Sequence, residues 1–95
     1  MATTNAVLRK RVERGAALLD AEQPGWAPRI DVPTLDISSP RYCVLGQTYP
    51  TLRSGIEALH LSPYQRVCSH GFDSDGYDQP QRLLPLWREA IEARC

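Results

Sequence analysis

The sequence predicts a compact all-α domain of about five helices, of which the central ones are short. Apolar residues recur three or four positions apart in several segments, as they do on the buried face of a helix. Eight prolines divide the 95 residues into short pieces, and no complementary pair of strands can be recognised. A chain of this length forms one domain, residues 1–95, and we expect residues 1–4 to be frayed.

The first helix should begin near Thr4 or Asn5, both good N-caps, and end near Glu22. Gly15 weakens this helix by up to about 1 kcal/mol unless another backbone packs closely against it. The apolar face of this helix has residues spaced by four, four and three positions: Leu8, Val12, Ala16 and Leu19.

Residues 26–39 should form an ordered, proline-rich connection. Four prolines punctuate this region: Pro24, Pro28, Pro33 and Pro40. Apolar anchors lie between them: Trp26, Ile30, Val32, Leu35 and Ile37. Because Pro33 would confine a strand to a sheet edge, we expect an extended segment or 3₁₀ turns that lie across the helices.

Capping patterns place the two central helices that follow. Ser39 followed by Pro40 is an N-cap with proline at the first helical position, which predicts a short helix over residues 40–49. Pro50 should end it. The next helix should carry Leu52, Ile56 and Leu59 on one face and end at residue 60 or 61.

Ser62 and Pro63 predict the start of another short helix, again as a cap followed by proline. This helix should stop at His70, because Gly71 suits a left-handed C-cap and Phe72 can fold back against it.

The last helix should begin after Asp78, and Pro85 should either kink it or mark its true start at Leu84. The aromatic residues Trp26, Trp87, Phe72 and Tyr64 are expected to be core anchors. The helical stripes and cap contacts together predict a buried core: Leu8, Val12, Leu19, Trp26, Leu45, Ile56, Leu59, Val67, Phe72, Leu84, Trp87 and Ile91.

Charge and composition exclude several classes of protein. Eleven basic residues balance eleven acidic ones, so no global field attracts nucleic acid or an anionic membrane. The N-terminus lacks the pattern of a signal peptide, and no apolar run approaches the roughly 20 residues that span a bilayer. Three cysteines without an export signal indicate reduced thiols. We therefore expect a soluble cytoplasmic protein without a membrane partner.

Cysteine and histidine residues offer only weak evidence of a metal site. Cys43, His60, Cys68 and His70 could supply four zinc ligands, but only Cys68 and His70 are close in sequence. On a helix these two point about 200° apart, so we expect no metal, no cofactor and buried free thiols. Cys43 has a second interpretation as a nucleophile near a helix N-terminus, with His60 or His70 as its base.

Residues 73–78 resemble part of a calcium loop. An EF-hand needs a bidentate Glu at loop position twelve, where this sequence has Leu84. We therefore expect a solvated polar turn without calcium.

Two surfaces are candidates for binding. Tyr42 and Tyr49, together with Arg41 and Arg53, could line a patch between the short helices. Tyrosine and arginine are enriched where proteins bind one another.

The alternative binding face is a basic cluster in the first helix: Arg9, Lys10, Arg11 and Arg14. It is most simply a solvated helical face, and it could also contact DNA or RNA phosphates. A helix-turn-helix would need more polar side chains on its recognition helix than this sequence offers.

Several short motifs in a fixed order carry a resemblance to a known family. They are Arg-Gly-Ala-Ala-Leu-Leu-Asp at residues 14–20, Pro-Gly-Trp at 24–26, Cys-Val-Leu-Gly-Gln-Thr-Tyr at 43–49, His-Gly-Phe-Asp at 70–73, and the closing helix with Trp87. From about Arg14 to Arg94 the chain resembles a family of small uncharacterised proteins of actinobacteria and actinobacteriophages. The resemblance implies an origin and a fold, and it implies a location in the bacterial host cell if a phage encodes the chain.

Small size, zero net charge and the absence of catalytic motifs favour a non-enzymatic accessory protein of the phage type. Such a protein acts by binding a host or viral macromolecule, and the resemblance to phage-associated proteins supports this interpretation. Two alternatives stay open: a protein that sequesters a small ligand or nucleotide, and a nucleic-acid-binding regulatory domain that uses the basic cluster. A thiol or metal enzyme has the least support.

Overall fold

The fold contains α-helices and 3₁₀ helices, and its described residues include no strand. A computed structural model describes residues 4–74, 76 and 79–95. The elements are α1 (Asn5–Glu22), η1 (Ala27–Arg29), η2 (Val32–Thr34), α2 (Val44–Thr48), α3 (Leu52–Ala58), α4 (Gln65–Ser69) and α5 (Gln79–Glu92). The radius of gyration is 11.9 Å, close to the roughly 12 Å of a compact domain of this length. The predicted all-α domain with short central helices is confirmed.

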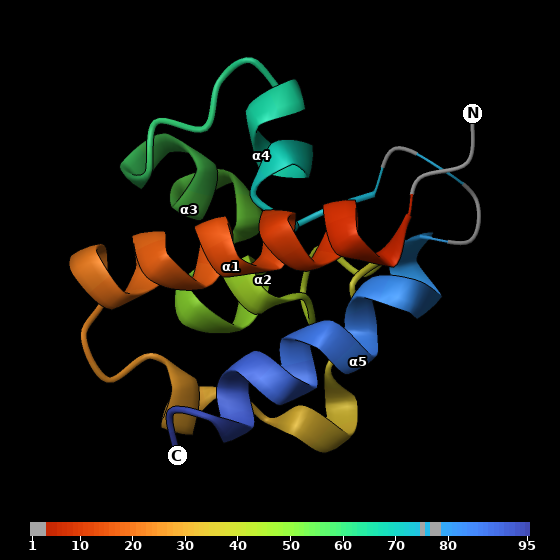
Figure 1. Ribbon diagram of the computed structural model, residues 1–95. Coiled ribbons are helices and arrows are strands. Elements are labelled where there is room, and N and C mark those ends of the chain that lie inside the picture. Colours follow the sequence, from red (N-terminus) through yellow and green to blue (C-terminus); the bar gives the residue numbers. More distant parts are fainter. Residues whose placement is uncertain (1–3, 75, 77–78) are drawn as a thin grey trace.

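The long helices α1 and α5 pack against each other, and the shorter elements lie around them. In Figure 1, α1 crosses the middle of the molecule, with α3 and α4 above it and α5 and the 3₁₀ helices below. Helix α1 also contacts α4, while α2 contacts α3 and η1 contacts α5. The proline-rich connection is ordered and contains 3₁₀ turns, as predicted.

Helix α1 has the predicted bounds because its cap is local. The Thr4 side chain accepts a hydrogen bond from the Val7 amide at 3.3 Å. Gly15 lies where the backbone of another segment comes close: a Cβ atom there would collide with the His70 carbonyl oxygen and stand 3.0 Å from the Trp87 ring. The glycine therefore permits α1 to pack against the end of α4.

Three aromatic rings form the centre of the core. The Trp26 and Trp87 ring centroids lie 6.0 Å apart in an edge-to-face arrangement, and Phe72 stacks on Trp87 at 5.4 Å. The indole N–H of Trp87 donates to the Gly71 carbonyl at 2.7 Å, so this ring is buried without an unpaired donor.

Ten of the twelve predicted core residues are buried, and two are only half-buried: Ile56 and Leu84. In α5 the buried face contains Leu83, Leu86, Trp87 and Ile91. Leu84 lies one residue, or about 100°, beyond Leu83 and so reaches only the edge of that face.

The predicted start of the first central helix is wrong. Residues 40–43 form a turn, in which the Ser39 hydroxyl accepts from the Arg41 and Tyr42 amides at 3.3 and 3.2 Å. Helix α2 begins later, with Cys43 as its N-cap, whose sulfur accepts from the Gly46 amide at 3.3 Å. Ser39 caps a turn because a Ser-Pro pair suits a turn as well as a helix start.

The predicted start of α4 is also wrong, whereas its predicted end is right. Pro63 and Tyr64 form a turn that precedes α4, with a cis peptide bond between Ser62 and Pro63. Tyr64 is 50% exposed and is not the core anchor that we predicted. The end is confirmed: Gly71 has φ of +72°, and the Phe72 amide donates to the Val67 carbonyl at 3.2 Å, as in a Schellman cap.

Helix α5 is continuous through Pro85, so the alternative start at Leu84 is wrong. Pro85 is exposed, and a carbonyl that loses its donor on the exposed side of a helix can be hydrated. The predicted cap at Asp78 lies outside the described residues.

Candidate functional site

Arg41 and Arg53 lie on the same groove. It has a volume of about 650 Å³ and is open to solvent. One wall is formed by Pro40 and Arg41 with Gly46 of α2, against which they pack, and the other by residues 50–53. We call it the arginine groove. Tyr42 and Tyr49 are not among its lining residues.

Both walls of the arginine groove are held by local contacts. The Pro40 and Arg41 carbonyls pack so closely on Gly46 that a Cβ atom there would collide with them. On the other wall, Thr51 and Ser54 form a reciprocal capping box, with amide-to-hydroxyl distances of 3.0 and 3.1 Å. The groove is therefore formed before any partner arrives, which lowers the entropy lost on binding.

The cations on this groove are available to a partner. Arg41 and Arg53 are both exposed. Among the described residues, neither forms an ion pair with an acidic side chain. The guanidinium of Arg41 lies 5.6 Å from the Tyr42 ring centroid, and Tyr42 is 44% exposed. Arg41 and Tyr42 therefore form a small cation–π pair at the edge of the groove.

Tyr49 has a different place. Its ring packs against Gly55 of α3, with a ring carbon 2.9 Å from the position of an added Cβ atom, and it packs on the core cluster. Tyr49 therefore joins α2 to α3 and covers the core there.

A second groove, which we did not predict from the sequence, lies between α3 and α4. Its volume is about 620 Å³, and its lining residues are Leu52, Arg53, Ile56, Glu57, His60, Ser62 and Arg66. We call it the α3–α4 groove. Arg66 donates to the His60 carbonyl at 3.3 Å, which connects α4 to the loop that follows α3. A basic residue on each of two successive short helices was the only local signal.

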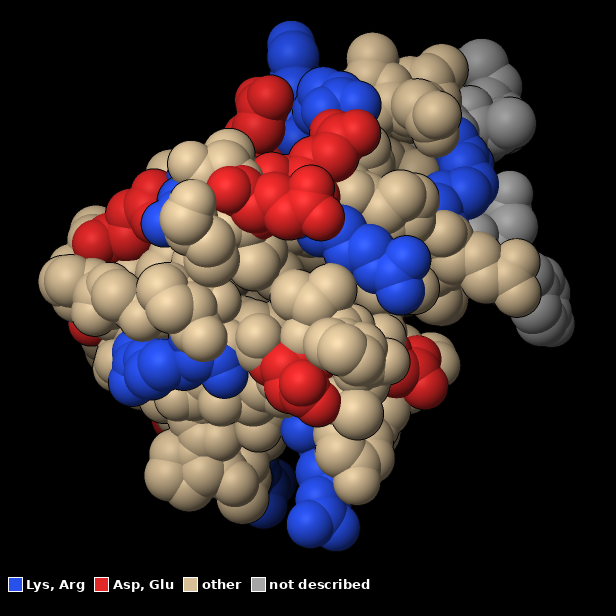
Figure 2. Space-filling view, turned by 90° about the horizontal axis from the view of Figure 1, so that it is seen from below, with Lys and Arg blue, Asp and Glu red and all other residues tan. Residues whose placement is uncertain are grey.

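The basic cluster of α1 is divided among different neighbours. Arg9 forms an ion pair with Glu89 of α5 at 2.7 Å, and Arg14 donates to the Ser69 carbonyl of α4 at 3.2 Å. Lys10 is exposed, and Arg11 is half-buried and lines a surface pocket with Tyr64 and residues of α4. Figure 2 shows acidic and basic side chains next to one another on the face seen from below, so that face presents no extended patch of one sign.

The thiols and imidazoles do not converge. Cys43 is only 2% exposed, and its burial raises the pKa of the thiol. Cys68 is half-buried, which corrects the expectation that both thiols are buried. His70 stacks on Phe72, and its Nδ1 lies 2.7 Å from the Arg66 carbonyl. The described residues contain no group of three potential metal ligands.

The expected polar turn at residues 73–78 is only partly described. The Asp73 carboxylate accepts from the Ser74 amide at 2.7 Å and contacts the Tyr64 hydroxyl. Asp75, Tyr77 and Asp78 lie outside the described residues.

Among the helices in the described ranges, none combines the length and apolar character needed to cross a membrane.

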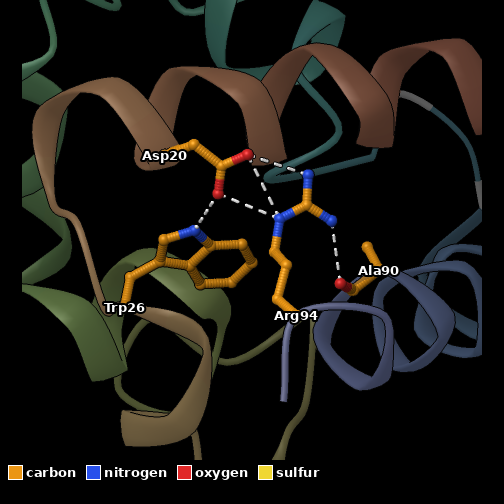
Figure 3. A network of polar contacts seen from close by, with 4 residues as sticks. All are labelled: Asp20, Trp26, Ala90 and Arg94. Carbon is orange, nitrogen blue, oxygen red and sulfur yellow. Dashed lines mark hydrogen bonds and ion pairs between the residues drawn. The ribbon is translucent and has the colours of Figure 1, made fainter.

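A polar network around Asp20, between the end of α1 and the Trp26 loop, was also not predicted from the sequence (Figure 3). The Asp20 carboxylate accepts from the Trp26 indole at 2.9 Å and from two nitrogens of Arg94, each at 2.9 Å. Arg94 also donates to the Ala90 carbonyl at 2.9 Å. Hydrogen bonds from Arg94 and Trp26 lower the pKa of Asp20. This network connects α1, the Trp26 loop and the end of the chain.

Comparisons of the chain with protein-family models, with curated proteins and with solved structures gave no match. The function is therefore inferred from the geometry of the two grooves and from the chemistry of their side chains.

Proposed function

We propose that this chain is a non-enzymatic accessory protein that binds a host or viral protein through the arginine groove. One observation carries the proposal: two exposed guanidinium groups, outside any ion pair among the described residues, line a groove that is otherwise largely apolar. The apolar part comes from Pro40, Pro50 and Leu52.

This combination of side chains suits a protein partner. Arginine contributes strongly to protein interfaces because its planar fork can donate two hydrogen bonds to one carboxylate while its stem packs on apolar groups. The prolines restrict the groove walls, and an ordered surface loses little entropy when a partner binds.

The environment of Cys43 supports a binding role over catalysis. A nucleophilic cysteine needs a lowered pKa and access to substrate. Cys43 is buried, burial raises its pKa, and its sulfur accepts the hydrogen bond that caps α2.

The same reasoning places the other two hypotheses second. A nucleic-acid surface needs several cations on one face, whereas Arg9 and Arg14 contact α5 and α4. A small ligand usually sits in a pocket that buries most of its surface, whereas the arginine groove is open to solvent.

Capture of partners from a lysate tests this proposal. The sequence resemblance indicates an actinobacterial lysate, and the baits are wild-type protein, an Arg41→Glu/Arg53→Glu double variant and an Arg88→Glu control. Arg88 is an exposed residue of α5 that does not line the groove. We expect wild type and Arg88→Glu to retain the same partner and the double variant to lose it at an unchanged melting temperature. A partner retained by the double variant would place the interface elsewhere, and the basic cluster would be tested next.

A further inference from the structure

The arginine groove and the α3–α4 groove adjoin. Leu52 and Arg53, at the start of α3, line both of them. Helix α3 has seven residues and is therefore about 10 Å long. The combined surface runs from the turn at Pro40, across the start of α3, to Arg66 in the first turn of α4.

Charge is unevenly distributed along this surface. Three arginines line it, Arg41, Arg53 and Arg66, against one acidic residue, Glu57. The whole chain has a net charge of zero, so the excess of positive charge is a local property. Arg66 uses one N–H group for the His60 carbonyl and has others left to donate.

Apolar groups lie between the cations. Leu52 and Ile56 are four residues apart on α3, so they share one face of the helix, and both are half-buried. A half-buried leucine and isoleucine can lose further exposed surface to an apolar side chain of a partner, which favours binding.

We infer that the two grooves form one channel that binds an acidic, extended segment of a protein partner. Carboxylates of the segment contact Arg41, Arg53 and Arg66, and an apolar side chain packs over Leu52 and Ile56. The inference rests on the proposed function, because it specifies the chemistry of the partner and the length of the site. An extended chain covers about 3.3 Å per residue, so α3 alone accommodates about three residues of the segment.

The lining side chains favour a peptide over a nucleic acid. Single strands bind proteins largely by stacking their bases on aromatic side chains. Among the described lining residues of the two grooves, His60 is the one aromatic side chain, and there is no Phe, Tyr or Trp. The apolar contacts come instead from aliphatic side chains and proline, which suit the aliphatic side chains of a peptide.

Fluorescence anisotropy with a defined probe tests the channel. The probe is a labelled peptide of about eight residues in which a central Leu is flanked by Glu and Asp, and the protein is the full chain. We expect Arg41→Glu, Arg53→Glu and Arg66→Glu each to weaken binding about three- to tenfold, and Arg88→Glu to leave it unchanged. A probe with Ser in place of the central Leu should bind about five- to tenfold more weakly. Arg66→Gln, which keeps a donor side chain, replaces Arg66→Glu if the latter melts early.

The outcomes separate this inference from the proposed function. If Arg66 variants bind the probe like wild type while Arg41→Glu and Arg53→Glu weaken probe binding, the site ends at Arg53. The inference that the two grooves form one site is then wrong. If the probe does not bind, but the lysate partner is lost from the Arg41→Glu/Arg53→Glu variant, the acidic segment is wrong and the proposed function stands. If Arg88→Glu weakens probe binding as much as the groove variants do, the effect of charge is nonspecific. If a single-stranded oligonucleotide of equal charge competes with the probe and binds more tightly, the surface binds nucleic acid and not a peptide. Either result overturns the inference.

Discussion

Two regions of this molecule use arginine in opposite ways. In the Trp26 region, Arg94 donates to both oxygens of Asp20 and lies 5.8 Å from the Trp26 ring centroid. In the arginine groove, Arg41 and Arg53 lie on a preformed surface and neither is in an ion pair with a described residue. An arginine whose donors are taken by its own chain stabilises the fold, whereas one on a rigid groove with free donors can bind a partner. The comparison teaches that arginine content alone does not locate a binding surface.

The largest expected effect on stability comes from the aromatic centre of the core, which includes Trp26. Trp87→Ala removes a ring that is fully buried and touches both Trp26 and Phe72. We expect it to lower the free energy of unfolding by about 3–5 kcal/mol, a large part of the stability of a small domain. Denaturant titration measures this, with Tyr42→Ala as the control, because Tyr42 is 44% exposed. If both variants lose the same stability, the core is not centred on these rings.

The close approach of α1 to the end of α4 gives the second prediction. Alanine is a better helix former than glycine by up to about 1 kcal/mol, yet a Cβ atom at position 15 collides with the His70 carbonyl. We therefore expect Gly15→Ala to destabilise the protein by about 1–3 kcal/mol. Ala17→Gly, at an exposed position of the same helix, should cost about 1 kcal/mol through propensity alone. A Gly15→Ala variant that melts above wild type would contradict the close approach.

The third prediction concerns the ion pair between Asp20 and Arg94. Arg94→Ala removes the ion pair with Asp20 at an exposed site, and we expect a loss of about 1 kcal/mol at pH 7. The pKa of Asp20 is lowered in the folded state from its ordinary 3.8, so its contribution is complete above that value. This contribution is lost as the pH falls through the folded pKa.

The stability difference between wild type and Arg94→Ala should therefore shrink below about pH 4. Denaturant titrations at several pH values measure it. Arg88→Ala, also exposed and in α5, is the matched control and should show no such dependence. A difference that stays constant down to pH 2 would mean that the Asp20–Arg94 pair contributes nothing to stability.

Signals contained in a few neighbouring residues predicted much of the fold. The Thr4 cap, the Gly71 cap and the spacing of Leu8, Val12 and Leu19 are local, and each appears as predicted. The start of α2 was not predictable in this way, because a cysteine sulfur caps it and cysteine is not among the preferred N-caps.

The candidate site was predictable only in part. The sequence grouped Arg41 and Arg53 in one candidate patch, and the structure brings both to one groove. Arg66 was missed because its proximity to Arg53 depends on how α3 and α4 pack. The Asp20–Arg94 pair joins residues 74 positions apart, and no sequence spacing predicts such a contact.

The smallest expected effect on stability comes from substitutions at Arg41 and Arg53 in the arginine groove. It is also the sharpest test of the comparison. Charge reversal at Arg41 and Arg53 removes no ion pair among the described residues and leaves the walls of the groove unchanged, because backbone packing and the Thr51 capping box hold them. Exposed substitutions of this kind change stability by less than about 0.5 kcal/mol each. We therefore expect Arg41→Glu and Arg53→Glu to melt like wild type, whereas Arg94→Glu, which places a like charge beside Asp20, should melt clearly earlier. Thermal denaturation followed by circular dichroism measures all three under the same conditions. If the groove variants lose as much stability as Arg94→Glu, then Arg41 and Arg53 stabilise the fold as Arg94 does. The contrast between the two regions would then be wrong, and so would the binding role inferred from it.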